Sequence, residues 1–151
     1  MNKVNILIVC TGNTCRSPMA EGILKSMLSE DDDIEVLSGG IFAFEGERVS
    51  ENASLALKEK GIDILSHRAQ SINASVIKDA DLILTMTRAH KNTLVGLFGD
   101  DIKNKVYTLC EYAGICGDID DPYGGDIDCY RRCADRLYSV MQIVYKKLME
   151  Q

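Results

Sequence analysis

The sequence predicts an α/β fold in which helices cover both faces of an open parallel sheet. Short apolar runs alternate along the chain with stretches of helical period, which is typical of strand–helix–strand units. The first run, residues 4–9, is nearly continuous in apolar, mostly β-branched side chains, as in a strand that is covered on both faces. The 151 residues contain no internal repeat or proline-rich linker, so we expect a single domain, residues 1–151.

The first half of the chain gives two such units. After the strand over residues 4–9, Pro18 fits the first turn of a helix because its missing N–H costs nothing there. Apolar residues then recur on one helical face as far as Leu28. A second strand over residues 34–37 precedes a helix that Ser50 caps and Gly61 ends.

The second half continues the alternation. The expected elements are, in chain order, a short helix that begins at Asn73 and runs through Ala80, a strand over residues 82–86, a helix over residues 87–98 that Gly99 ends, a strand over residues 106–109, a long loop over residues 110–128 and a final helix with an apolar face that reaches Leu148. Open sheets of this kind bind ligands beyond the carboxyl ends of their strands. We therefore look for chemistry in the loop after the first strand.

Composition and charge restrict the functions to consider. The chain carries 17 basic and 23 acidic residues, a formal net charge of −6, which argues against broad binding to nucleic acid or to an anionic membrane. The apolar run near the N-terminus is too short for a signal peptide or a membrane span, so we expect a cytoplasmic protein. In that reducing compartment the six cysteines should be free thiols, and their spacing predicts no structural metal site. No cofactor is expected.

The segment from Cys10 to Ser17 has the features of a phosphate-binding loop. A cysteine ends the first strand, and Arg16 opens the next helix six positions later. The residues between them can form a ring whose N–H groups point inward at a tetrahedral anion, with a helix N-terminus behind it. The candidate phosphate-binding residues are Thr11, Gly12, Asn13, Thr14, Cys15, Arg16 and Ser17. Gly12 and Asn13 tolerate the left-handed conformation that such a ring needs.

The same ring would activate Cys10 as a nucleophile. Backbone amides, a helix N-terminus and the Arg16 guanidinium should depress the pKa of the thiol, so that it is largely thiolate at neutral pH. A thiolate beneath a bound phosphoryl group can attack it in line without a metal ion. The alternative is structural, with Cys10 as a small buried side chain and Arg16 as a surface residue of the helix.

The loop after the fourth strand offers the acid that such a reaction requires. It contains Asp121, followed by Pro122, Tyr123 and two glycines. A loop at the carboxyl end of a neighbouring strand can reach over the Cys10 loop, and Asp121 could then protonate a leaving group. Taken alone, an Asp-Pro pair is more often a solvated turn.

Together these segments resemble the low-molecular-weight protein tyrosine phosphatase family. The resemblance rests on Cys10 to Ser17 with the Pro-Met-Ala-Glu that follows, on Asp-Pro-Tyr-Gly at residues 121–124, and on the segments 38–40 and 66–68, and it covers nearly the whole chain. It implies a four-stranded parallel sheet in the order 2-1-3-4 with a phosphatase P-loop after the first strand. It also implies a phosphocysteine mechanism. The implied catalytic residues are Cys10, Arg16 and Asp121, and the supporting residues are Asn13, Ser17, Ser38 and His67. For His67 a structural role is an equal alternative.

Two threonines in the loop make the sequence more similar to the bacterial protein-arginine phosphatase branch. The family usually has apolar residues at the positions of Thr11 and Thr14, and often a second aromatic where Gly124 stands. A phosphoguanidinium needs hydrogen-bond acceptors around its N–H groups, whereas a phenyl ring needs apolar walls. Thr14 and Tyr123 are therefore the expected specificity residues, and Asp120 or Asp126 would attract the cation to the rim. The two threonines alternatively serve only to satisfy the loop.

The leading hypothesis is thus a metal-independent hydrolase of phosphoarginine in proteins, with inorganic phosphate or vanadate as further ligands. The first alternative is a protein tyrosine phosphatase. An arsenate reductase on this fold would need a cysteine just after the third strand, where residues 84–87 have none. A non-catalytic module that binds phosphoproteins would not need the nucleophile, arginine and acid together.

Cys15, Cys129, Cys133 and His90 are not among the expected catalytic residues. A reversible disulfide between Cys10 and Cys15 would protect the nucleophile from over-oxidation, although Cys15 could equally be a packed small side chain. Cys129 and Cys133, one turn apart, are expected to pack in the final helix. His90, with Lys91 beside it, is expected at the solvated surface.

Overall fold

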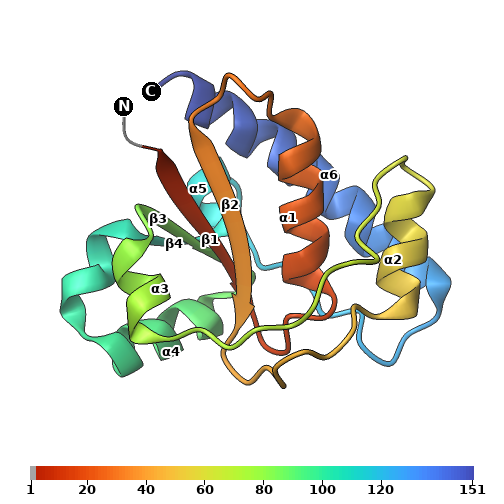
Figure 1. The fold of residues 1–151 in the computed structure, drawn as a ribbon, viewed down its shortest axis with the longest axis horizontal. Coiled ribbons are helices and arrows are strands. Elements are labelled where there is room, and N and C mark those ends of the chain that lie inside the picture. The colour runs from red at the N-terminus through yellow and green to blue at the C-terminus, as the bar shows by residue number, and fades with distance from the viewer. Residues whose placement is uncertain (1–2) are drawn as a thin grey trace.

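The computed structural model describes residues 3–151, and its central sheet is the predicted one. The elements are β1 (Val4–Cys10), α1 (Arg16–Met27), β2 (Ile34–Gly40), α2 (Glu51–Lys58), α3 (Ala74–Asp79), β3 (Leu82–Thr85), α4 (Arg88–Phe98), the 3-10 helix η1 (Asp100–Lys105), β4 (Val106–Thr108), α5 (Leu109–Ala113) and α6 (Ile127–Met149). The four strands pair in the order β2-β1-β3-β4, and every pair is parallel (Figure 1). The predicted fold class and strand order are confirmed.

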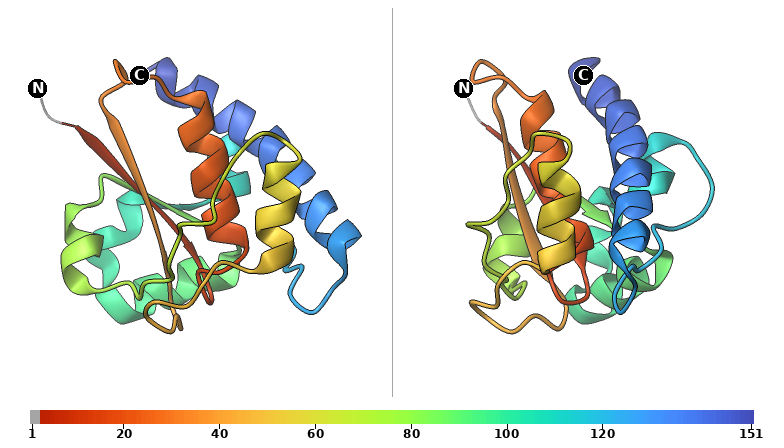
Figure 2. Two further views of the ribbon diagram at one scale, coloured as in Figure 1. Left: turned by 45° about the vertical axis from the view of Figure 1, so that its right-hand side comes forward. Right: turned by 90° about the vertical axis from the view of Figure 1, so that its right-hand side faces the viewer.

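Helices cover both faces of the sheet, as the continuous apolar runs predicted. On one face Ile6 and Ile8 of β1 pack with α1, α2, α5 and α6 in the larger core. On the other face Leu7 and Val9, which alternate with them along the same strand, pack with α3, α4 and η1. The turned views show the sheet between these two groups of helices (Figure 2). Because β1 is central, it is buried on both faces, and its end is held firmly.

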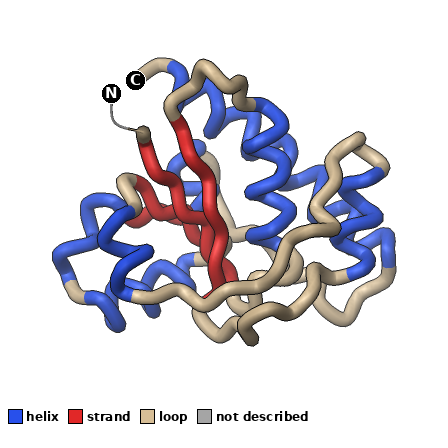
Figure 3. Tube along the Cα trace, in the orientation of Figure 1, coloured by secondary structure: helices blue, strands red, loops and turns tan. Residues whose placement is uncertain are grey.

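The loops that follow the strands gather at one edge of the sheet (Figure 3). In the parallel register Cys10 lies opposite Gly40, Val9 opposite Thr85, and Thr85 opposite Thr108. The segments that begin after these positions therefore start side by side. This edge is where the sequence predicted the phosphate-binding loop.

Most element boundaries agree with the sequence, and the differences have local causes. Strand β2 runs three residues further than expected, to Gly40, because Ser38 and both glycines pair with β1. The expected loop over residues 110–128 is shorter, since it begins with helix α5 and ends where Asp126 caps α6. Helix α5 starts with a capping box in which the Thr108 and Glu111 side chains bond each other's backbone N–H groups.

Within residues 3–151, no helix combines the length and the apolar character that crossing a bilayer requires.

Candidate active site

The loop between β1 and α1 forms a ring around the Cys10 sulfur. The Asn13 N–H lies 3.3 Å from Cys10 Sγ and the Ser17 hydroxyl oxygen 2.9 Å from it. Asn13 adopts φ 57°, the left-handed conformation, and is the only residue other than glycine among residues 3–151 with a positive φ. This turn directs the Asn13 N–H inward. Helix α1 begins at Arg16, so its N-terminus faces the same space.

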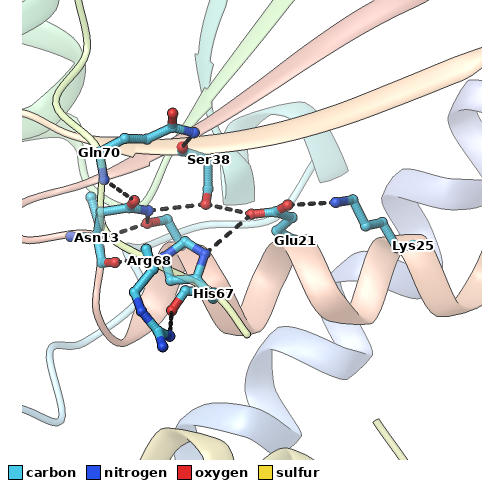
Figure 4. A network of polar contacts seen from close by, with 9 residues as sticks. Asn13, Glu21, Lys25, Ser38, His67, Arg68 and Gln70 are labelled. Atoms are coloured by element: carbon cyan, nitrogen blue, oxygen red, sulfur yellow. Dashed lines mark hydrogen bonds and ion pairs between the residues drawn. The ribbon is translucent and has the colours of Figure 1, made fainter. Parts of the chain in front are cut away.

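Buried hydrogen bonds hold Asn13 in this conformation (Figure 4). Its Nδ2 group donates to Ser17 Oγ at 2.8 Å and to Ser38 Oγ at 3.0 Å. Its Oδ1 accepts from the Gln70 N–H at 3.0 Å, and its carbonyl lies 2.9 Å from His67 Nε2. Because a carbonyl only accepts, His67 Nε2 carries the proton. Three segments far apart in the sequence thus fix one residue of the ring.

The network continues to Glu21 on α1 and thereby sets the directions of the hydroxyl protons (Figure 4). Ser38 Oγ donates to Glu21 Oε1, and Lys25 Nζ donates to Glu21 Oε2 at 2.6 Å. Ser17 Oγ accepts from Asn13, so its own proton is free to donate to Cys10 Sγ. With Ser17 as the donor, the sulfur receives two hydrogen bonds, one from this hydroxyl and one from the Asn13 N–H.

Arg16 connects this ring to the loop before α6. Its side chain is buried; one terminal nitrogen donates to the Ile119 carbonyl at 2.9 Å, and the other lies 3.5 Å from Asp121 Oδ2. Asp121 is half exposed, and its Oδ1 accepts from the Tyr123 N–H at 3.0 Å. The structure thus brings the predicted arginine and the predicted acid together beside the cysteine, from positions about a hundred residues apart.

Above the ring lies an open cavity of about 260 Å³. Its floor is formed by Cys10, Thr11, Gly12, Thr14, Cys15 and Arg16, and its walls by Phe42, Phe44, Glu47, Asp121 and Tyr123. The three wall aromatics are strongly exposed, at 74%, 79% and 80%. Of the predicted loop residues, Asn13 and Ser17 do not reach the cavity, because they are fully buried beneath it.

The cavity wall that follows β2 was not predicted from the sequence. Phe42, Phe44 and Glu47 lie in the loop after that strand, and the parallel topology places this loop at the same edge of the sheet as Cys10. Their position directly after the second strand was the one feature of the sequence that could have indicated that these residues line the site. The predicted rim acids do not line this cavity: Asp120 lines a neighbouring one, and Asp126 caps α6. Glu47 supplies the second carboxylate instead.

The prediction that His90 is a solvated surface residue is wrong. His90 is 8% exposed, and its ring nitrogens lie 2.8 Å from Thr11 Oγ1 and 2.9 Å from Thr87 Oγ1. Burial, reinforced by the nearby Arg16 guanidinium, lowers the pKa of His90 to about 4. Lys91 is also partly buried, and its Nζ lies 2.8 Å from Glu111 Oε1. Helix α4 starts directly after β3, which places its first turn beside the ring.

All six cysteines are free thiols, including Cys10 and Cys15, which are both buried. Cys15 Sγ lies 3.8 Å from the Tyr130 hydroxyl, and burial raises the pKa of its thiol. Cys133, on α6, packs in the larger core as expected, and burial raises the pKa of its thiol to about 12. Cys129 is only half buried.

Within residues 3–151, no three His, Cys, Asp or Glu side chains gather so that they could hold a metal ion.

Comparison with known proteins agrees with this geometry. The family model for low molecular weight phosphotyrosine protein phosphatase matches residues 5–151. The chain belongs to this family. Among its relatives, the protein-arginine-phosphatase of Geobacillus stearothermophilus is 42% identical over 147 residues, which are 97% of each chain. The low molecular weight protein-tyrosine-phosphatase PtpB of Staphylococcus epidermidis is 42% identical over 138 residues, 91% of this chain and 94% of the relative.

A solved structure of the same phosphatase family adds chemical information. It is a cysteine-to-serine mutant of YwlE arginine phosphatase with a phosphorylated active-site serine. Its TM-score to this phosphatase is 0.93 at 38% identity, and the match covers 98% of this chain and 97% of that chain. In that protein, a side chain that replaces a cysteine carries the phosphoryl group.

Proposed function

We propose that this phosphatase hydrolyses phosphoarginine residues in proteins through a phosphocysteine intermediate on Cys10. The observation that carries the proposal is the Cys10 sulfur at the floor of an open cavity, with two hydrogen-bond donors directed at it and with Arg16 and Asp121 beside it. The relative named protein-arginine-phosphatase and the YwlE structure with its phosphorylated serine support it.

In the first step the phosphoryl group would sit in the ring, on N–H groups of the loop residues that line the cavity and on the Arg16 guanidinium. Arg16 would then exchange its contact with Asp121 for a bidentate contact with two phosphoryl oxygens. The Cys10 thiolate attacks phosphorus in line while the bond from phosphorus to the arginine nitrogen breaks. Asp121, half exposed at the cavity mouth, gives that nitrogen its proton.

In the second step Asp121 would act as a base. It takes a proton from a water molecule whose oxygen attacks the phosphocysteine, and the sulfur–phosphorus bond breaks. The step returns Cys10 as a thiolate and Asp121 as an acid, and it releases inorganic phosphate. Ser17 and Asn13 would stabilise the thiolate as it leaves, through the hydrogen bonds that they direct at the sulfur.

The acceptors around the cavity favour a guanidinium over a phenyl group. A phosphorylated guanidinium carries several N–H donors, and Thr14, Glu47 and Asp121 offer oxygen acceptors to them. The exposed aromatics, Phe42 and Tyr123 among them, do not discriminate, because their faces can stack on a guanidinium or on a phenyl ring. The relatives named protein-tyrosine-phosphatase make phosphotyrosine the second candidate substrate.

The test compares turnover of two peptides that are identical except for phosphoarginine or phosphotyrosine, with Cys10→Ser as the control. We expect a higher kcat/KM for phosphoarginine and no turnover by the control. A higher kcat/KM for phosphotyrosine would overturn the substrate assignment. The Thr14→Ile variant removes an acceptor and adds an apolar wall, so we expect the ratio to move toward phosphotyrosine. If the ratio does not move, Thr14 does not select the substrate.

The remaining expectations belong to this proposal. Substrates would be phosphorylated proteins. Inorganic phosphate and vanadate would compete with the substrate's phosphoryl group for the ring, because they are tetrahedral or can mimic the transferred group. Six free thiols, one of them the nucleophile, suit the reducing cytoplasm. Binding of vanadate measured by calorimetric titration, and lost in a protein with Arg16→Ala, would support the assigned anion site.

A further inference from the structure

His90 is a buried titratable group that the mechanism above does not use. It lies in the first turn of α4, and its two ring nitrogens each meet one threonine hydroxyl. Thr87, on one side, is the N-cap of α4. Thr11, on the other side, directly follows the nucleophile, is exposed and lines the cavity. The histidine therefore connects a helix cap to the phosphate-binding ring.

The hydrogen-bond partners determine which ring nitrogen of His90 carries the proton. Thr87 Oγ1 accepts from the His90 backbone N–H at 3.1 Å. Its own proton has one acceptor among the described residues, His90 Nδ1 at 2.9 Å. With Nδ1 as the acceptor, Nε2 carries the hydrogen and donates to Thr11 Oγ1 at 2.8 Å.

The opposite tautomer leaves the Thr87 hydroxyl proton without an acceptor among the described residues. If Nδ1 carried the hydrogen, Thr87 Oγ1 would accept twice and its own proton would have no acceptor in the described structure. The Thr11 proton would then be bound to Nε2, and Thr11 would present a lone pair to the cavity. A lone pair at this position would repel a phosphoryl oxygen. The first tautomer avoids both penalties.

We infer that His90 is a positioning residue that holds the Thr11 hydroxyl as a hydrogen-bond donor to a phosphoryl oxygen in the cavity. The contacts run in one direction, from Thr87 O–H to His90 Nδ1 and from His90 Nε2–H to Thr11 Oγ1. Thr11 Oγ1 thus accepts a hydrogen bond from His90 Nε2–H, and its own proton is free to donate to the ligand. The inference deepens the proposed function, since it adds a donor to the phosphate-binding ring.

The surroundings of His90 keep it neutral, as this role requires. Arg16, Asp118 and Asp121 are the charged groups that act on the imidazole, and burial together with Arg16 lowers its pKa to about 4. The Thr85 hydroxyl donates to the Thr87 carbonyl at 2.8 Å and so holds the cap in place. A neutral ring with a fixed tautomer is available at all pH values near neutrality.

The test is a double-mutant cycle read by calorimetric titration with inorganic phosphate. His90→Leu removes the contact with Thr11, and Thr11→Val removes the hydroxyl. We expect each single change to raise the Kd for phosphate about five- to tenfold, as loss of one hydrogen bond to an anion does. In the Thr11→Val background His90→Leu should add less than twofold, because both changes remove the same donor. Independent, multiplicative effects of the two changes would overturn the inference.

Conservative variants separate positioning from a structural role. The Nε2 group of a glutamine can take the place of the histidine Nε2–H, so His90→Gln should restore phosphate binding relative to His90→Leu, and Thr11→Ser should do so relative to Thr11→Val. A Thr11→Val protein that binds phosphate as the parent does would contradict the role of the hydroxyl. If His90→Leu does not fold, His90→Asn takes its place in the cycle, because its shorter amide can keep the contact with Thr87 but cannot reach Thr11.

Phosphate binding is measured apart from turnover, so this inference and the proposed function can fail separately. A protein that prefers phosphotyrosine peptides but shows the expected non-additivity would retain the His90 role. Turnover of phosphoarginine together with multiplicative effects would retain the proposed function and reject the role of His90.

Discussion

The left-handed conformation of Asn13 leads to the most detailed prediction. Replacing Asn13 by Ala removes three side-chain hydrogen bonds, to Ser17, to Ser38 and from the Gln70 N–H, in a site that is fully buried. Each lost bond costs about 1 kcal/mol of net stability. An alanine at φ 57° adds about 1 kcal/mol of backbone strain. We therefore expect the free energy of unfolding to fall by about 4 kcal/mol.

A glycine at the same position separates the two causes. Asn13→Gly loses the same hydrogen bonds but tolerates the positive φ, so it should be about 1 kcal/mol more stable than Asn13→Ala. Urea denaturation at neutral pH measures both values against the parent. Both variants should also lose most of their turnover, because Ser17 is no longer held as a donor to Cys10. A loss of less than about 1 kcal/mol in Asn13→Ala, or an alanine variant as stable as the glycine variant, would refute this reasoning.

Three further predictions follow from the same edge of the sheet. In Gly40→Ala the new Cβ would lie 2.6 Å from the Thr11 carbonyl oxygen. Because this clash would displace the ring, phosphate affinity should fall at least about tenfold. Calorimetry that shows parental affinity would contradict this. The unfolded chain protonates His90 near pH 6.5 and the folded chain only near pH 4, so stability falls as pH decreases through this window. Between pH 7 and pH 4 the free energy of unfolding of the parent should fall by up to about 3 kcal/mol more than that of His90→Gln, and equal losses would exclude this cause. Peroxide should inactivate the parent reversibly through a disulfide between Cys10 and Cys15, and Cys15→Ser should recover less activity with added thiol; equal recovery in both proteins would count against the disulfide.

Local patterns were sufficient to predict the strands and the loop around Cys10, whereas the strand order was implied by the family resemblance. The apolar run at β1 indicated a central strand, and the cysteine at its end with an arginine six positions later marked the ring. The Asp-Pro pair at residues 121–122 gained meaning only because the topology places its loop beside that ring, as the contact between Arg16 and Asp121 confirms. These features share one property, namely that the residues which carry them are close in sequence or fixed by the strand order.

The cavity walls and the residue behind the ring could not be predicted in this way. Phe44 and Glu47 are ordinary residue types in a loop without a motif, and only the register of β2 against β1 places them at the mouth. His90 lies at a helix start that also fits an exposed position, and its burial depends on the packing of α4 against a loop about eighty residues earlier. Helix α5 is different, since the Thr108-x-x-Glu111 spacing is a readable helix start within the stretch assigned to a loop.

The most direct test of the account is the covalent state of Cys10 during turnover. The parent protein is mixed with a phosphoarginine peptide and quenched in acid within the first turnover, and the digest is analysed by mass spectrometry. We expect a phosphoryl adduct on Cys10 that forms within the first turnover and disappears as the substrate is consumed. Phosphate release with no adduct on this cysteine, or undiminished release by Cys10→Ser, would contradict the account.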